Sequence, residues 1–167
     1  ELPRRVAVFG PGVIGLELGQ ALARLSVEVR VFGDSGSLGG ISDPRVRSAA
    51  CGIFQQEFYL DPHARVIEAK REGDEVEIRY IDLDGRERVE RFDAVLMATG
   101  RRPNTAFLDL NKAGIPLDAQ GIPVFDRETM QVGDTPVFIA GDVNADVPLL
   151  HEAADEGKIA GDNAARF

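Results

Sequence analysis

The 167-residue sequence predicts an α/β fold in which a parallel sheet carries an inserted antiparallel β-meander. An apolar run at residues 6–9 is followed by a glycine-rich turn and then by apolar residues at helical spacing. A second run, rich in β-branched residues, comes at 27–32, so the two strands are joined by a right-handed parallel crossover. From 65 to 92 the apolar period changes to two, which is typical of a meander.

Two helices are expected between the parallel strands. The buried face of the first is expected to contain Ile14, Leu18, Ala21, Leu22 and Leu25. The second is expected to begin after Asp43, which can cap it, with Pro44 in its first position. Its buried stripe is expected to contain Val46, Ala49, Ala50, Ile53 and Phe54, and a third parallel strand is expected near 58–60.

The remaining elements divide the chain near residue 104. Gly73-Asp74 and Asp84-Gly85 supply the meander turns, and 94–98 is expected to form a buried strand. After 104 prolines become frequent, and only one strand at 137–140 and one helix from about 149 to 165 are expected. One strand and one helix cannot bury a core, so residues 105–167 are predicted to belong to a domain whose remainder lies elsewhere.

Composition excludes several classes of function. A net charge of −9 and a pI of about 4.7 disfavour nucleic acid and anionic lipid as partners. Apolar stretches of about five residues are far short of the roughly 20 that a membrane-spanning helix needs. We therefore expect a soluble, cytoplasmic protein, and Glu1 at its start suggests a cut point in a longer chain.

Cysteine and histidine are too few to predict a metal site. The single Cys51 cannot form an internal disulfide, which suits a reducing compartment, and it is expected to be a small buried hydrophobe. His63 and His151 have no metal-ligand spacing with it or with each other, so no metal ligand is assigned.

Residues 10–15, with the sequence G-P-G-V-I-G, match the pattern G-x-G-x-x-G between a predicted strand and a predicted helix. Gly10 allows a tight turn, Gly12 lets a pyrophosphate approach the backbone, and Gly15 permits close packing of the helix on the strand. The helix N-terminus adds unpaired N–H groups and partial positive charge. The motif predicts dinucleotide binding by a Rossmann-like sheet, and the alternative is a purely structural glycine-rich turn.

The end of the second strand bears on the choice of cofactor. An acid that holds the adenosine ribose is expected there, but the sequence has Gly33, with Asp34 one residue later. An aspartate beside the 2′ position would repel a 2′-phosphate, which favours NAD and leaves NADP possible. The alternative is that Asp34 faces solvent in a loop. Glu17, near the helix start, can simply complement the helix dipole.

Three motifs in order carry a family resemblance: V-F-G-P-G-V-I-G-L-E at 8–17, A-T-G-R-R-P-N at 98–104, and I-A-G-D at 139–142 followed by L-H-E-A-A-D-E-G at 150–157. Together they resemble the pyridine nucleotide-disulfide oxidoreductases, and within that family they most resemble the dihydrolipoamide dehydrogenases. The resemblance implies an NAD(P)-binding domain at residues 1–104 and the C-terminal segment of a split FAD-binding domain at 105–167.

The resemblance also implies roles for individual residues. Residues 12–15 would meet the pyrophosphate, and Glu17 would orient the nicotinamide carboxamide. Asp142 would accept hydrogen bonds from the ribityl chain of FAD, although without the resemblance it is an ordinary turn residue. The helix after Leu149 would direct its N-terminus at the flavin and stabilise negative charge on it. The full cofactor-binding set is Gly10, Gly12, Val13, Ile14, Gly15, Glu17, Gly33, Asp34, Val66, Gly100, Arg101, Gly141, Asp142, Leu149, Leu150 and His151.

Parts of the family pattern are missing from this sequence. It has no redox pair of cysteines, no first FAD glycine motif and no C-terminal domain with a His-Glu pair, so no catalytic residue is assigned. We expect the central fragment of an FAD-dependent, NAD(H)-linked oxidoreductase, inactive alone, from a homodimeric parent. The alternative is a non-enzymatic dinucleotide-binding module or redox sensor. Within the family, glutathione, mercuric ion or a second nicotinamide are alternative substrates.

Overall fold

The computed structural model describes residues 2–167, which form two compact units. The N-terminal unit extends to Gly100, and the C-terminal unit runs from Arg101 to Phe167. In the part of the chain that the structure describes, no helix is both long and apolar enough to cross a membrane.

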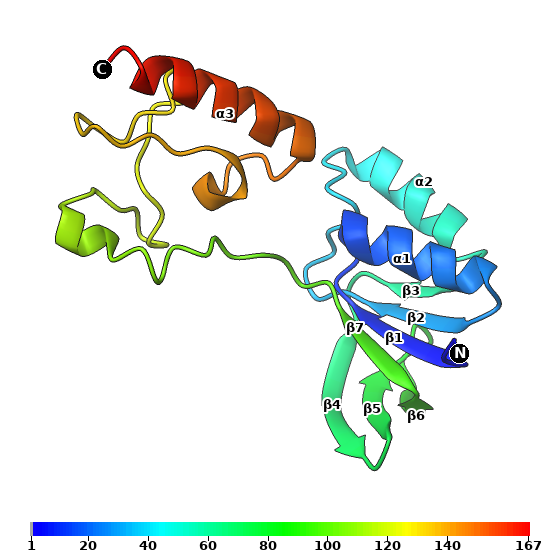
Figure 1. Cartoon of the computed structure of the whole chain (residues 1–167). Coiled ribbons are helices and arrows are strands. Elements are labelled where there is room, and N and C mark those ends of the chain that lie inside the picture. Colours follow the sequence, from blue (N-terminus) through cyan, green and yellow to red (C-terminus); the bar gives the residue numbers. More distant parts are fainter. Residues whose placement is uncertain (1) are drawn as a thin grey trace. The chain divides into compact units, whose positions relative to one another are not determined.

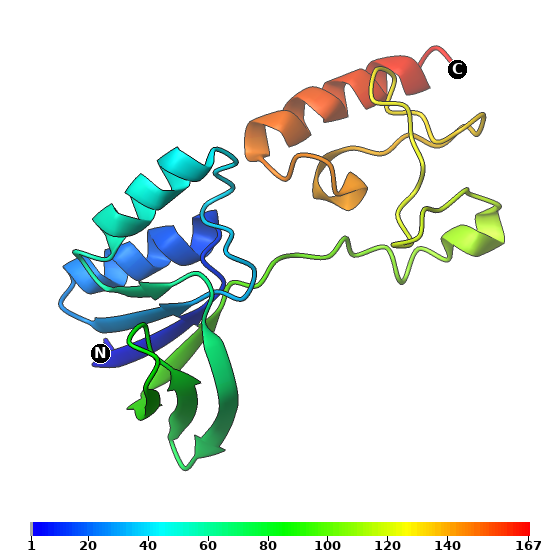
Figure 2. The ribbon, with the colours of Figure 1, turned by 180° about the vertical axis from the view of Figure 1, so that it is seen from behind.

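The N-terminal unit is built on a four-stranded parallel sheet (Figures 1 and 2). Its strands are β1 (Arg5–Phe9), β2 (Glu28–Phe32), β3 (Tyr59–Asp61) and β7 (Ala94–Met97), in the order β3-β2-β1-β7. Helix α1 (Val13–Arg24) joins β1 to β2, and α2 (Pro44–Phe54) precedes β3. The predicted α/β class and its parallel crossover are confirmed, because every pair in this sheet is parallel.

The predicted meander is also confirmed. Strands β4 (Arg65–Glu72), β5 (Glu75–Ile81) and β6 (Glu87–Phe92) form a separate antiparallel sheet in sequence order. It covers the face of the parallel sheet that lies opposite α1 and α2 (Figure 1).

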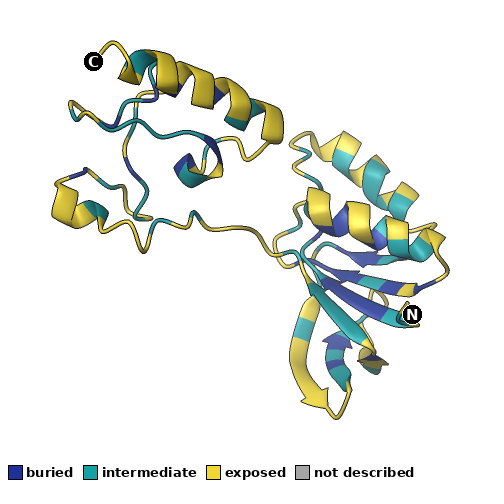
Figure 3. Ribbon diagram, viewed as in Figure 1, coloured by how far each residue is buried: buried dark blue, intermediate teal, exposed yellow. Residues whose placement is uncertain are grey.

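Strands β1 and β2 are largely buried (Figure 3). Both faces of the parallel sheet are covered, and alternation along β1 divides the core in two. Val6 and Val8 pack under the helices, whereas Ala7 packs against the meander. On the meander side, Phe32 lies edge-on to Tyr80, with their ring centroids 4.9 Å apart. Burial on both faces explains why β1 and β2 are apolar at successive positions.

The expected buried face of α1 is wrong except at Leu22, which is partly buried and packs against the core. The residues that α1 buries are Gly15, Leu16 and Gly19, whereas Leu18 is 45% exposed and Leu25 is 60% exposed. A β-carbon on Gly19 would already lie 3.4 Å from the Val31 side chain. The helix thus approaches the sheet along its glycines, and the larger apolar residues that the spacing favoured lie to the side of this contact.

Helix α2 begins as expected, but its buried stripe is shifted. An Asp43 carboxylate oxygen accepts hydrogen bonds from the backbone N–H groups of Arg45, at 2.8 Å, and Val46, at 3.1 Å. Val46 and Ile53 are more than half exposed, whereas the predicted Ala50 and Phe54 do pack against the core, together with Cys51. Burial, and then Asp61, raises the pKa of the Cys51 thiol, so the half-buried thiol stays protonated near neutral pH.

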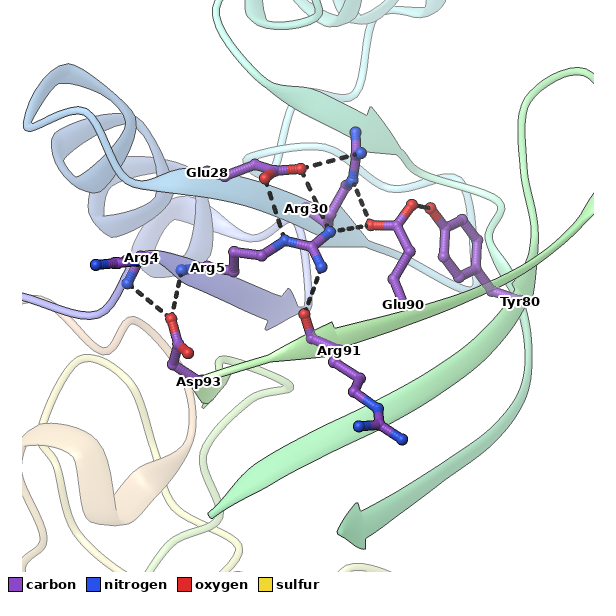
Figure 4. A network of polar contacts seen from close by, with 8 residues as sticks. All are labelled: Arg4, Arg5, Glu28, Arg30, Tyr80, Glu90, Arg91 and Asp93. Carbon is purple, nitrogen blue, oxygen red and sulfur yellow. Dashed lines mark hydrogen bonds and ion pairs between the residues drawn. The ribbon is translucent and has the colours of Figure 1, made fainter. Parts of the chain in front are cut away.

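An ion-pair network joins the meander to the parallel sheet (Figure 4). The Glu90 carboxylate on β6 lies 2.6 Å from the Arg5 guanidinium and 3.2 Å from that of Arg30. The Tyr80 hydroxyl donates to its other oxygen at 2.7 Å. Burial opposes ionisation of Glu90, but the Tyr80 hydrogen bond and the two arginines outweigh it and lower its pKa.

The C-terminal unit has little regular structure beyond one helix. It contains the 3₁₀ turns η1 (Leu110–Ala113) and η2 (Gly141–Asn144) and the helix α3 (Leu150–Ala164), which confirms the expected helix. The strand expected at 137–140 is wrong: within the described residues that run makes only the isolated bridge between Gln131 and Phe138. A strand needs a neighbouring ladder, and the chain offers this run only the short segment around Val132 to pair with.

Candidate functional site

A cavity of about 500 Å³ lies where β1, β2 and β7 end at their carboxyl termini. It is lined by Phe9, Gly10, Pro11, Gly12, Phe32, Gly33, Asp34, Ser35, Ser37, Ala64, Val66, Ala98, Thr99 and Gly100. Strand β1 has β2 on one side and β7 on the other, so the cavity lies at the point where the winding of the sheet reverses. In open α/β sheets this crevice is where ligands bind.

Gly10 and Gly15 give the turn after β1 its compact form. Gly10 has a φ of +100°, and its N–H donates to the Phe32 carbonyl at 2.8 Å. A β-carbon on Gly10 would collide with the carbonyl of Ala98, and one on Gly15 would collide with the carbonyl of Gly10. Only glycine allows β1, α1 and the end of β7 to approach this closely.

Gly12 differs, because a β-carbon there would have no atom within 4 Å. It lines the cavity and is the N-cap of α1, and within residues 2–167 no side chain hydrogen-bonds to the start of this helix. The first N–H groups of a helix have no intrahelical partner. The open space beside Gly12 thus leaves these amides available to a ligand in the cavity.

The loop after β2 forms the far side of the cavity. Gly33 is buried, and its N–H donates to the Asp61 carbonyl at 2.8 Å. Asp34 and Ser35 are exposed in the cavity wall, and the Ser35 and Ser37 hydroxyl oxygens lie 3.0 Å apart.

The structure brings six of the predicted site residues into this cavity: Gly10, Gly12, Gly33, Asp34, Val66 and Gly100. Val13, Ile14 and Glu17 are exposed on α1 and are not among the residues that line the cavity. Glu17 lies beyond the first turn of the helix, so the expectation that it complements the helix dipole is wrong, because that effect fades within the first turn.

Several cavity residues that were not predicted lie between and beside the predicted ones. They include Pro11, Ser35, Ser37, Ala64 and Thr99. The signal for most of them was their place directly after a strand of the parallel sheet, since all such loops meet at one edge. Ala64 carries the same signal, because it lies in the loop that follows β3 and leads into the meander.

In the C-terminal unit, Asp142 is paired with a cation. The Arg101 guanidinium lies 2.7 Å from the Asp142 carboxylate and also donates to the Pro148 carbonyl at 3.1 Å. Both side chains are about half exposed, so the pair remains open to a ligand and to solvent.

A buried carboxylate holds the turn that carries Asp142. Glu156 on α3 is 7% exposed and accepts hydrogen bonds from the Gly141 N–H, at 2.6 Å, and the Asn144 amide, at 2.8 Å. Gly141 has a φ of +76°, a conformation that favours glycine. No motif in the sequence indicates this role for Glu156, which lies twelve residues beyond the turn.

The start of α3 is exposed and has no side-chain cap among the described residues. Leu149 is the N-cap, Leu150 is 90% exposed, and His151 is exposed beside Glu152, with 3.9 Å between its ring nitrogen and the carboxylate. Predicted residues Gly141, Asp142, Leu149, Leu150 and His151 therefore all lie around the turn η2 and the first turn of α3.

A family model described as pyridine nucleotide-disulphide oxidoreductase matches residues 1–157. A mercuric reductase of Staphylococcus aureus is 35% identical over 98% of this chain and 30% of its own length. A dihydrolipoyl dehydrogenase of Manduca sexta is also 35% identical, over 93% of this chain and 32% of its own length. The chain thus spans about a third of the length of the curated relatives it matches.

Solved structures give the same result for the fold. The crystal structure of LpdA from Mycobacterium tuberculosis matches 99% of this chain and 35% of its own, with 29% identity and a TM-score of 0.81. The flavoprotein disulfide reductase RclA of Escherichia coli, at 23% identity, matches 97% of this chain and 36% of its own with the same TM-score and supports the fold alone.

Proposed function

Because this chain belongs to the pyridine nucleotide-disulphide oxidoreductase family, we propose that its N-terminal unit binds NAD(H) for hydride exchange with FAD in a larger flavoprotein. Members of the family use a pyridine nucleotide and FAD. The observation that carries the proposal is the uncapped start of α1 at Gly12, which opens onto a cavity at the reversal point of the parallel sheet.

The residues around this cavity fit a dinucleotide. Its volume of about 500 Å³ lies within the range of small-molecule and cofactor sites. The Gly12 position would admit a pyrophosphate that a β-carbon would obstruct, and the α1 N–H groups would stabilise its charge. Val66 and Ala64 supply an apolar wall for the adenine, and Gly100 borders the same groove. When bound, the nicotinamide would supply or accept the hydride.

On the nicotinamide side we propose that Ile14 and Glu17 act from the exposed face of α1. In the C-terminal unit we propose that Asp142 receives the ribityl hydroxyls of FAD. Arg101 would orient the Asp142 carboxylate, and the α3 N-terminus from Leu149 to His151 would favour negative charge on a flavin nearby.

The final substrate of the whole protein would be a dithiol–disulfide pair or another two-electron redox partner. A dihydrolipoyl dehydrogenase and a mercuric reductase match this chain at the same identity, so this segment supports the dithiol and mercuric substrates equally. We propose a homodimeric parent and retain a cytoplasmic location as a prediction, although curated relatives include mitochondrial ones. A family match over most of the chain favours the enzyme over a non-enzymatic module.

The experiment that tests this function uses Gly12→Asp. Aspartate is a preferred N-cap, so α1 should be preserved while a carboxylate occupies the pyrophosphate position. We expect the affinity for NADH, measured by calorimetric titration, to fall by more than about tenfold through like-charge repulsion and lost space. Gly52→Asp on α2 is the matched control, because Gly52 lies outside the cavity and, like Gly12, has no atom within 4 Å of an added β-carbon. Equal NADH affinity in both variants would reject the site.

A further inference from the structure

The surroundings of Gly33 bear on which dinucleotide the cavity accepts, a question that rests on the proposed function. In sites of this fold, an acidic side chain near the end of the second strand hydrogen-bonds the ribose hydroxyls of NAD, whereas an arginine accommodates the 2′-phosphate of NADP. Here β2 ends at Phe32, and the next residue has no side chain.

Residue 33 is closed to any side chain from two directions. A β-carbon on Gly33 would lie 2.7 Å from the Pro11 ring and 2.7 Å from the Pro62 carbonyl oxygen, closer than real β-carbons approach such atoms. The Pro11 ring is held by its own backbone, because it locks φ. The proline in the glycine-rich turn therefore requires that the residue after β2 be glycine.

The backbone around Gly33 has little freedom to move away from this contact. The Gly33 N–H donates to the Asp61 carbonyl at 2.8 Å, and the Gly36 N–H donates to the Pro62 carbonyl at 2.9 Å. Further along the same loop, the Gly39 N–H donates to the Pro11 carbonyl at 2.8 Å. The loop is thus attached both to the end of β3 and to the glycine-rich turn, so a side chain at 33 would have to break one of these attachments.

Asp34 is the carboxylate that remains in the cavity wall. It is exposed and borders the same cavity as Gly12, next to the Ser35 hydroxyl. Among the lining residues in the described chain, none is an arginine or a lysine. A 2′-phosphate in this cavity would therefore face a carboxylate with no lining cation to offset it.

We propose that Pro11 and Gly33 set the cofactor specificity of this chain: together they exclude a side chain at the usual acid position, so that Asp34 reads the ribose 2′-hydroxyl and excludes a 2′-phosphate. The ligand class is an adenine dinucleotide whose ribose is unphosphorylated. Asp34 contacts the ligand, and Pro11 acts through Gly33 as a positioning residue.

The test uses ADP-ribose and 2′-phospho-ADP-ribose, which carry the adenosine halves of NAD and NADP, titrated calorimetrically into the full 167-residue chain. We expect ADP-ribose to bind at least about tenfold more tightly than its 2′-phosphate. Asp34→Asn should lower the affinity for ADP-ribose by roughly tenfold, which is the effect of losing a hydrogen bond to a charged group. It should also reduce the ratio between the affinities for the two ligands. Asp74→Asn, an exposed turn residue outside the cavity, removes the same charge and should change neither affinity.

A second variant tests the exclusion at residue 33. Gly33→Asp is added to Asp34→Asn to return a carboxylate to the usual position. We expect no recovery of ADP-ribose affinity, together with a lower melting temperature. Recovery of affinity in a protein as stable as the wild type would overturn the role of Pro11 and Gly33. Equal binding of the two ligands by the wild type would overturn the role of Asp34, whereas failure of ADP-ribose and NADH alike to bind would reject the proposed function itself.

Discussion

At the scale of single residues, two glycines of the same turn have different physical reasons to be glycine. Gly10 has a positive φ and lies against the Ala98 carbonyl, so its lack of a side chain is needed for the fold. Gly12 has an extended backbone and open space around it, so its lack of a side chain is needed only by a ligand. Within three residues, one glycine is therefore required for stability and the other for binding.

We therefore predict that Gly10→Ala lowers the free energy of unfolding of the N-terminal unit by about 2 kcal/mol or more, through backbone strain and the clash with Ala98. Gly12→Ala should cost less than about 1 kcal/mol, since it changes only an N-cap. The measurement is urea denaturation followed by tyrosine fluorescence. The chain has no tryptophan, and both of its tyrosines, Tyr59 and Tyr80, lie in this unit. Equal destabilisation by the two variants would contradict this division of roles.

At the scale of elements, the Glu90 network attaches the meander to the parallel sheet. Glu90 on β6 contacts Arg5 on β1 and Arg30 on β2, so one carboxylate connects three strands from two sheets. Val66, at the start of β4, lines the cavity, and the position of the meander therefore helps to shape the proposed adenine wall.

This network predicts a pH-dependent stability. A lowered pKa means that the unfolded chain binds the proton more readily than the folded one. The ionised Glu90 therefore stabilises the fold above the ordinary glutamate pKa of about 4.3, and this contribution is lost as the pH falls through the lowered folded pKa. Glu90→Gln should cost about 1–3 kcal/mol at pH 7, since it leaves two partly buried arginines with only the half-exposed Glu28 as an ionic partner.

Urea unfolding at pH 7 and near pH 3 measures this effect. The difference between wild type and Glu90→Gln should shrink at the lower pH, where the wild-type carboxyl group is also losing its charge. Glu87→Gln, on the same strand but more than half exposed, is the control and should cost less than about 0.5 kcal/mol. If the loss of unfolding free energy in Glu90→Gln did not change with pH, packing rather than the charge of Glu90 would attach the meander to the parallel sheet.

At the scale of the whole molecule, the most exposed apolar side chains among the described residues lie in the C-terminal unit. The N-terminal unit buries two core clusters around its parallel sheet. The C-terminal unit leaves Phe107 at 89%, Leu108 at 57% and Leu150 at 90% exposure. Such residues normally find a partner surface, as residues 105–167 would if they form part of a domain completed elsewhere.

We predict that the isolated 167-residue chain self-associates through the C-terminal unit. Light scattering coupled to size-exclusion chromatography should give a mass that rises with concentration. The double variant Phe107→Glu and Leu150→Glu should shift it towards the monomer, because both residues are nearly fully exposed. Leu83→Glu in the meander turn, also exposed, is the matched control and should leave the association unchanged. A rigid monomer at all concentrations would contradict the prediction.

Several features followed from the sequence alone because they depend on local rules. The period-two pattern of the meander, the Asp43 cap and the G-x-G-x-x-G turn each express backbone chemistry that a few neighbouring residues determine. The resemblance carried by the three motifs identified the family for the same reason, since each motif is a short run of contiguous residues.

Only the tertiary structure decided which residues meet across the chain. In the structure, α1 packs on the sheet with its glycine side, and residues 137–140 form no strand because they have no neighbouring ladder. The Glu156 carboxylate hydrogen-bonds to the turn at Gly141. The tertiary structure also placed Pro11 against Gly33, residues from two different loops. Packing and hydrogen bonding between distant segments depend on how closely backbones approach, and neither periodicity nor motif spacing contains that distance.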